Sequence, residues 1–156
     1  MAAPPEPLEV GTTAPAFTAT THDGTTLALA DYIGRKVALY FYPKDMTPGC
    51  TNQACNLRDG LAELAAAGVA VIGVSPDPLD RHARFAEKYD LNFPLVADPE
   101  HEIIAEYGVW GEKKNYGKTF MGLQRTTFLI DEMGVITHVF KKPKTTDHTA
   151  EILSKL

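Results

Sequence analysis

The feature that most constrains the fold is a pair of short apolar segments separated by one amphipathic stretch. Val37–Tyr42 and Val69–Val74 are continuous runs of apolar residues. Such runs are typical of strands that are buried on both faces. Between them, residues 50–67 predict one helix that stops at Gly68, a residue suited to a helix end. A strand, a helix and a second strand in this order predict a β-α-β unit, with parallel strands and a right-handed crossover.

The rest of the chain predicts short strands and helices in alternation. The predicted strands are Phe17–Thr20, Thr25–Leu29, Pro94–Asp98, Thr126–Ile130 and Val135–Phe140, the last two forming a hairpin. The predicted helices are 80–89, capped by Asp80, His101–Tyr107, and a C-terminal helix that begins at Thr146 or Asp147. Residues 111–124 are expected to form a long polar loop. A β-α-β half followed by a β-β-α half predicts an α/β protein with the thioredoxin-like fold, a central mixed β-sheet flanked by helices.

Length and charge restrict the classes of protein that fit. We expect residues 1–156 to form a single domain, with residues 1–10 as a frayed leader that lacks the apolar core of a secretory signal. A net charge of −5 argues against nucleic-acid binding, so we interpret the lysines at 113–118 and 141–144 as solvated. The longest apolar runs are too short to cross a bilayer. We therefore expect a soluble cytoplasmic protein with no nucleic-acid or membrane partner.

The chain has two cysteines, Cys50 and Cys55. In a reducing compartment such a pair indicates catalysis, redox chemistry or metal binding rather than a structural disulfide. Cys50 begins the apolar stripe of the predicted helix and lies in its first turn, where free backbone N–H groups favour an anion. No acidic residue follows it in that turn. Helical phase alone leaves two interpretations open, a reactive thiolate or a small buried apolar residue.

The residues before Cys50 favour the first interpretation. Residues 43–50, PKDMTPGC, match the PxxxTxxC motif of peroxiredoxins, and residues 39–59 resemble the branch called bacterioferritin comigratory protein, or PrxQ. The resemblance continues through Gly73–Ser75, Phe93–Leu95 and residues 108–131, so it covers most of the chain.

This resemblance implies a role for several residues. Cys50 is the peroxidatic nucleophile that becomes a sulfenic acid, and Thr47 hydrogen-bonds the thiolate and the peroxide. Pro43 shields the pocket, the backbone of Gly49 holds the peroxide, and Arg125 stabilises the thiolate and the leaving oxygen. Many relatives have glutamate at the position of Gln53, so the acidic partner expected for the guanidinium is here an amide that accepts a hydrogen bond without charge.

The resemblance also implies that Cys55 is the resolving cysteine. Five residues of helix separate the two Cα atoms by about 8.6 Å, whereas a disulfide needs roughly 4.4–6.8 Å. The start of the helix must therefore unwind for a disulfide to form. Alternatively, Cys55 is a bystander and the protein is a one-cysteine peroxidase reduced by an external thiol.

Three other functions are alternatives to a peroxidase. A zinc site would need two further ligands, and His22, His82, His101, His138 and His148 show no paired ligand spacing, so we interpret them as surface or hydrogen-bonded residues. A dithiol oxidoreductase normally has C-x-x-C, and this chain has C-x4-C. A redox sensor or holdase would use the same sulfenic chemistry with little turnover.

The sequence thus predicts a thiol-dependent peroxidase that needs no metal or organic cofactor. Its substrates would be hydrogen peroxide and organic hydroperoxides. The resemblance implies thioredoxin as the reductant, with glutaredoxin as an alternative, and a monomer. Near the predicted loop, Trp110, Phe120 and Met121 either line the substrate side of the pocket or pack in the core.

Overall fold

The structure is a computed structural model that describes residues 3–156, and for Asn115 only the backbone. Its strands are β1 (Thr18–Thr20), β2 (Thr26–Ala28), β3 (Lys36–Phe41), β4 (Val69–Ser75), β5 (Leu95–Ala97), β6 (Trp110–Asn115), β7 (Lys118–Leu123), β8 (Thr126–Ile130) and β9 (Ile136–Phe140). Its helices are η1 (Leu29–Tyr32, a 3-10 turn), α1 (Pro48–Asp59), α2 (Leu61–Ala66), α3 (Leu79–Lys88), α4 (Glu102–Glu106) and α5 (His148–Leu153). Within residues 3–156, no helix has the length and apolar character needed to span a membrane.

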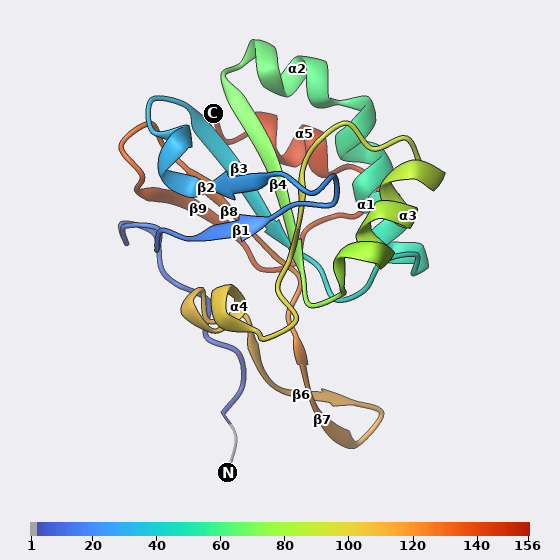
Figure 1. The fold of residues 1–156 in the computed structure, drawn as a ribbon. Coiled ribbons are helices and arrows are strands. Elements are labelled where there is room, and N and C mark those ends of the chain that lie inside the picture. Colours follow the sequence, from blue (N-terminus) through green and yellow to red (C-terminus); the bar gives the residue numbers. More distant parts are fainter. Residues whose placement is uncertain (1–2) are drawn as a thin grey trace.

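Five strands form the central sheet in the order β5-β4-β3-β8-β9 (Figure 1). β3 pairs parallel to β4, and β4 parallel to β5, whereas β8 pairs antiparallel to both β3 and β9. The predicted parallel β-α-β unit and the predicted hairpin are therefore confirmed. Together they form the mixed sheet of the thioredoxin-like fold.

The two faces of β3 explain why its sequence is apolar throughout. Val37, Leu39 and Phe41 belong to one core cluster, and the alternate residues Ala38, Tyr40 and Tyr42, which directly follows the strand, belong to the other. Side chains alternate between the faces of a strand, so a strand covered on both faces is apolar at every position. The first cluster includes residues of α4, and the second includes Cys50 and buried residues of α1, α2, α3 and α5.

The single helix predicted for residues 50–67 is wrong, because the helix is interrupted at Gly60. α1 ends at Asp59 and α2 begins at Leu61, with Gly60 buried between them. A β carbon at Gly60 would overlap the side chain of Thr149 in α5. The break lets α5 pack closely against the end of α1. The apolar stripe itself is confirmed at Cys50, Ala54, Leu57 and Leu64, which are all buried.

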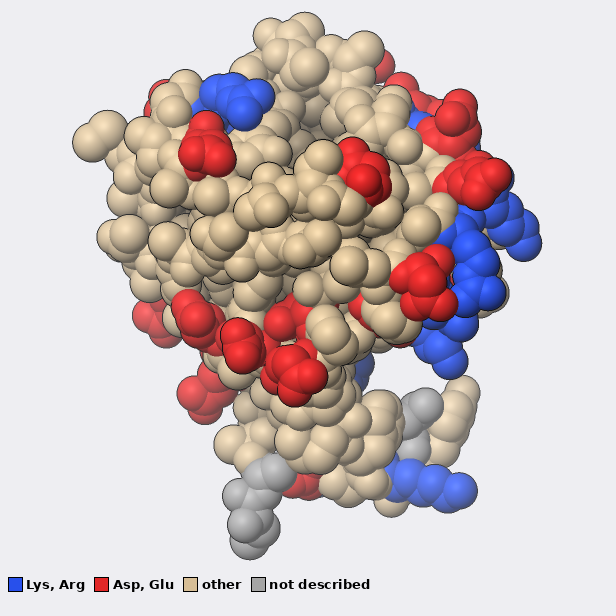
Figure 2. Space-filling model, viewed as in Figure 1, with Lys and Arg blue, Asp and Glu red and all other residues tan. Residues whose placement is uncertain are grey.

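The long loop predicted for residues 111–124 is wrong, because most of these residues belong to a β-hairpin. β6 and β7 pair antiparallel from Trp110–Leu123 to Asn115–Lys118, and we call residues 110–123 the arm. Its turn residues Tyr116 and Gly117 both have positive φ, 51° and 79°, a combination that suits a tight two-residue hairpin turn. The arm projects away from the sheet (Figure 1). Its surface is mostly uncharged in the view of Figure 2, with a blue basic side chain near the tip.

The N-terminal segment and the start of α3 also differ from the prediction. Residues 3–10 are not a frayed leader, because the Ala3 carbonyl accepts from Glu112 N–H (2.8 Å) and Leu8 N–H donates to Tyr107 (3.2 Å); residues 1–2 lie outside the described residues. α3 begins at Leu79, after Pro78, so Asp80 lies inside the first turn and does not cap it.

We predict that Gly60→Ala destabilises the protein by about 1–3 kcal/mol, because the added methyl overpacks the contact with Thr149. The local φ of −93° suits alanine, so without that contact the change would be neutral or stabilising. Urea unfolding of the variant gives the difference directly.

Thr149→Ala serves as the matched control, because it removes the Cγ2 and Oγ1 atoms that the new methyl would overlap. In that background the destabilisation by Gly60→Ala should shrink. An equal loss in both backgrounds would show that Thr149 does not cause the helix break.

Candidate active site

The candidate site lies where β3 ends and α1 begins. Thr47 is the N-cap residue of α1, Pro48 occupies its first position, and the first turn holds no acidic residue. Cys50 therefore lies in the first turn, with its side chain only 1% exposed. Backbone N–H groups in this turn have no partner within the helix and are suited to bind an anion.

Arg125 reaches the cysteine from the other half of the chain. Phe41 at the end of β3 pairs with Thr126 at the start of β8, which places Arg125 at the same end of the sheet as α1. Its Nη2 donates to Cys50 Sγ at 3.2 Å. A guanidinium stays charged at any working pH, so this contact places a permanent positive charge beside the sulfur.

Gln53 orients the guanidinium. Its Oε1 accepts from Arg125 Nη1 at 2.6 Å, so the amide does accept the hydrogen bond that we expected of it. Gln53 is fully buried, and within residues 3–156 its Nε2 has no hydrogen-bond partner. Arg125 thus bridges two residues of one helix, one turn apart.

Thr47, Pro43 and Gly49 lie close to the cysteine in the sequence and in the fold. Thr47 Oγ1 donates to the Lys44 carbonyl at 2.9 Å, so its single proton points into the loop in this state. Pro43 is half-buried in the same loop. A β carbon at Gly49 would lie 3.2 Å from Arg125 Nη2, a close approach that explains glycine at this position.

Cys55 lies on the same helix as Cys50, half-buried, and both thiols are free. α1 is continuous across both residues, so the structure represents a state in which the two sulfurs are not bonded. Within residues 3–156, no group of three or more Cys, His, Asp or Glu side chains is arranged to hold a metal ion.

Several buried polar side chains lie near the site, and no pattern in the sequence predicted most of them. Burial raises the pKa of Tyr40 and of Tyr42 well above 10, so both phenols stay protonated. Asp45 and His82 form a fully buried pair. His82 shares the inner face of α3 with Phe85 and Ala86, so its position in the helical pattern was the available signal.

A second buried histidine supports the strand that follows Arg125. His148 Nε2 lies 2.8 Å from Thr127 Oγ1, and its Nδ1 lies 2.9 Å from Glu151 Oε1. Burial lowers the pKa of His148; Glu151 opposes this shift and the charge of Arg125 adds to it, and the pKa remains below its ordinary value. The balance favours a neutral ring at neutral pH.

The three large side chains near the predicted loop have different environments. Trp110 contacts His101 in a tilted arrangement, with ring centroids 4.3 Å apart, and packs against the core. Phe120 and Met121 lie on β7 and remain 46% and 48% exposed. Core packing is therefore the outcome for Trp110 alone.

The fold is a thioredoxin-like sheet. A buried cysteine lies in the first turn of a helix, and a guanidinium contacts its sulfur. This arrangement is typical of enzymes that use a cysteine nucleophile. Comparison with known proteins identifies the family. Residues 10–139 match the AhpC/TSA family. The chain belongs to this family and is a peroxiredoxin, a thiol-dependent peroxidase.

Individual relatives support the same assignment over nearly the whole chain. It is 49% identical over 150 residues to a putative peroxiredoxin Bcp of Haemophilus influenzae, covering 96% of this chain and 97% of the relative. Peroxiredoxin Bcp of Escherichia coli is also 49% identical over 150 residues, with 96% of each chain covered. Bacterioferritin comigratory protein of Xanthomonas campestris has a solved structure with a TM-score of 0.85 and 33% identity, covering 94% of each chain.

We predict that Gln53→Ala slows oxidation of Cys50 by hydrogen peroxide about tenfold, because a misdirected guanidinium stabilises the developing charge less well. Gln53→Glu should stay within about threefold of the parent, because a carboxylate also accepts from Arg125. Single-turnover kinetics measure both rates.

Asn52→Ala is the control, because Asn52 is the exposed neighbour on the same helix. Its rate should not change. Equal rates for Gln53→Ala and the parent would contradict an orienting role for the amide.

Proposed function

We propose that Cys50 attacks hydrogen peroxide and organic hydroperoxides as a thiolate. The sulfur displaces alkoxide or hydroxide from the O–O bond and becomes a sulfenic acid; the leaving oxygen takes up a proton. The observation that carries this proposal is the contact between Arg125 Nη2 and Cys50 Sγ, in a site where the sulfur is almost completely buried. The guanidinium would stabilise the thiolate first and the leaving oxygen afterwards.

The neighbouring groups would then hold the peroxide. The Thr47 hydroxyl can rotate from the Lys44 carbonyl toward a bound oxygen, and the N–H groups of Gly49 and Cys50 lie in the open first turn of α1. Pro43 covers this part of the loop and would keep water out. The solved relative from Xanthomonas campestris is described as having alkyl peroxide reduction activity, which supports organic hydroperoxides as substrates here.

Cys55 would resolve the sulfenic acid. Its thiol attacks Cys50 sulfur, water leaves, and a disulfide forms between the two residues. Because both lie on the intact α1, the residues from Cys50 to Cys55 must first leave the helical conformation. Thr51 and Asn52 between them are weak helix formers, which lowers the cost of this opening.

A dithiol protein of the thioredoxin type would reduce the disulfide and complete the cycle, with glutaredoxin as an alternative donor. One chain supplies every side chain to which we assign a role in the cycle, namely Cys50, Cys55, Thr47, Gln53 and Arg125. We therefore infer that a monomer suffices for catalysis. A cycle that ends in reduction by a dithiol protein suits a reducing compartment, which supports a cytoplasmic location.

We predict that one equivalent of hydrogen peroxide removes both free thiols of the wild type. Cys55→Ser should lose its single remaining thiol to a sulfenic acid, and Cys50→Ser should lose none. Thiol titration and intact mass distinguish these products, because a disulfide lowers the mass by two hydrogen atoms and a sulfenic acid raises it by one oxygen.

Steady-state turnover completes this test. With thioredoxin, its reductase and NADPH, the wild type should consume peroxide and Cys50→Ser should not. Loss of only one thiol in the wild type would instead indicate a one-cysteine peroxidase. A wild type that oxidises but fails to turn over with any dithiol donor would indicate a redox sensor or holdase, and unimpaired turnover by Cys50→Ser would refute the assignment.

A further inference from the structure

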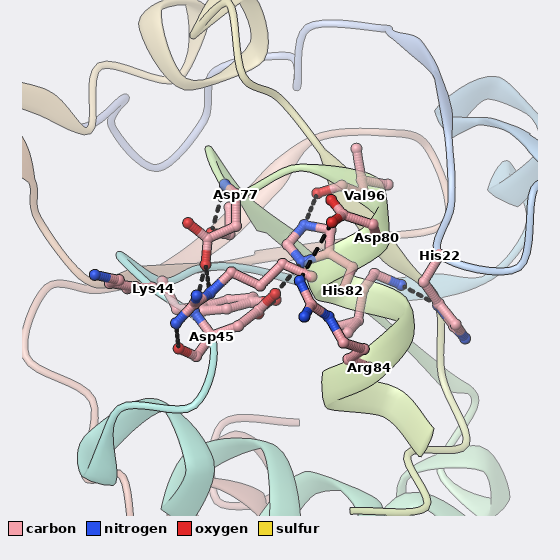
Figure 3. A network of polar contacts seen from close by, with 12 residues as sticks. His22, Lys44, Asp45, Asp77, Asp80, His82, Arg84 and Val96 are labelled. Carbon is pink, nitrogen blue, oxygen red and sulfur yellow. Dashed lines mark hydrogen bonds and ion pairs between the residues drawn. The ribbon is translucent and has the colours of Figure 1, made fainter. Parts of the chain in front are cut away.

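Asp45, in the loop between β3 and α1, is fully buried, and each of its four polar groups has a partner (Figure 3). Tyr42 OH donates to its Oδ1 at 2.6 Å, and His82 Nδ1 lies 2.5 Å from its Oδ2. Its backbone N–H donates to Asp77 Oδ2 at 2.7 Å, and its carbonyl accepts from Arg81 Nη2 at 3.0 Å. We call these five residues the Asp45 clamp.

The clamp is anchored in the core by the histidine. His82 Nε2 lies 3.1 Å from the Val96 carbonyl in β5. A carbonyl oxygen only accepts, so Nε2 carries a proton, and a second proton lies between Nδ1 and the Asp45 carboxyl. Both His82 and Asp45 are completely buried, so neither exchanges these partners for water without opening the structure.

Met46 follows Asp45 directly and has the unusual backbone conformation that the clamp explains. Its φ is 66°, in the left-handed region, which is unfavourable for a residue with a β carbon. Such conformations persist where the surroundings fix the chain on both sides. Here the clamp fixes Asp45, and Thr47 is already the N-cap of α1. The turn at Met46 redirects the chain from the end of β3 into the helix.

We propose that Asp45 and His82 are positioning residues of the peroxidase reaction. By holding Met46 in the left-handed conformation, they set the Thr47 hydroxyl and the start of α1 relative to Arg125. Because the inference concerns the reaction of Cys50, it rests on the proposed function.

The geometry separates this role from a contribution to stability alone. Arg125 precedes β8 and contacts Cys50 and Gln53, and within residues 3–156 no hydrogen bond or ion pair joins it to the clamp. Thr47, by contrast, is two residues from Asp45. Release of the clamp should therefore displace the Thr47 hydroxyl more than the pairing of sulfur and guanidinium. The reaction with peroxide needs the Thr47 hydroxyl as well as the thiolate paired with Arg125. Alkylation needs only the thiolate, so its rate should fall less than the rate with peroxide.

The test compares two reactions of Cys50 in a Cys55→Ser parent, where it is the only thiol. Asp45→Ala should lower the rate with hydrogen peroxide about 10- to 100-fold and the rate with iodoacetamide by no more than about threefold. Asp45→Asn should react with peroxide nearly as fast as the parent, because its amide accepts from Tyr42 and donates to His82 Nδ1. Asp80→Asn, an exposed change on α3 that leaves the clamp intact, is the control and should alter neither rate.

Two further variants keep the test decisive. Asparagine tolerates positive φ better than methionine, so Met46→Asn should restore part of the peroxide rate in the Asp45→Ala protein. Where Asp45→Ala does not fold, Tyr42→Phe removes a single clamp hydrogen bond and should lower the peroxide rate a few-fold relative to alkylation.

The outcomes separate this inference from the proposed function. Equal losses in both reactions, an unchanged peroxide rate, or a loss in Asp45→Asn as large as in Asp45→Ala would each overturn the positioning role. A parent that reacts with peroxide no faster than a free thiol would overturn the proposed function itself, and the positioning role with it.

Discussion

The contact between the Arg125 guanidinium and the Cys50 sulfur is the interaction on which the rest of this structure depends. The two residues are 75 positions apart, and Nη2 lies 3.2 Å from Sγ. A buried anion is stable only beside an opposite charge or several donors. The sheet supplies that charge, because the pairing of β3 with β8 brings the start of β8 beside the start of α1. Gln53 then fixes the guanidinium from the same helix that carries the sulfur.

Two segments position this contact, and they are held differently. The loop before α1 is fixed by Asp45, which has buried hydrogen-bond partners on α3 and at the end of β3. The helix α1 itself begins without a side-chain cap and ends after twelve residues at Gly60. A helix of this length gains little from propensity and depends on packing. The arrangement therefore suits a cycle in which the first turns of α1 open to let Cys55 approach Cys50 while the loop beneath stays fixed.

The sequence predicted the parts of the fold that depend on local pattern. The apolar runs at β3 and β4 and the hairpin β8–β9 follow from side-chain alternation, and Cys50 follows from helical phase and the PxxxTxxC motif. The break at Gly60 was missed, because the contact that requires glycine there is with Thr149, almost ninety residues away. The arm was missed because its turn, Tyr116-Gly117, uses a tyrosine where asparagine or glycine is the usual signal. The partnership of Asp45 with His82 joins a loop to a helix, and no spacing within either segment indicates it.

The most direct test of this account is the rate at which Cys50 reacts with hydrogen peroxide in a single turnover after the guanidinium is removed. We expect Arg125→Ala to be slower by a factor of about 10²–10³, and added ethylguanidinium to restore part of the rate by occupying the space left by the side chain. Arg125→Lys should fall between the two proteins, because it keeps a charge and loses the fork that reaches sulfur and amide together. An Arg125→Ala protein that reacts as fast as the wild type would contradict the account.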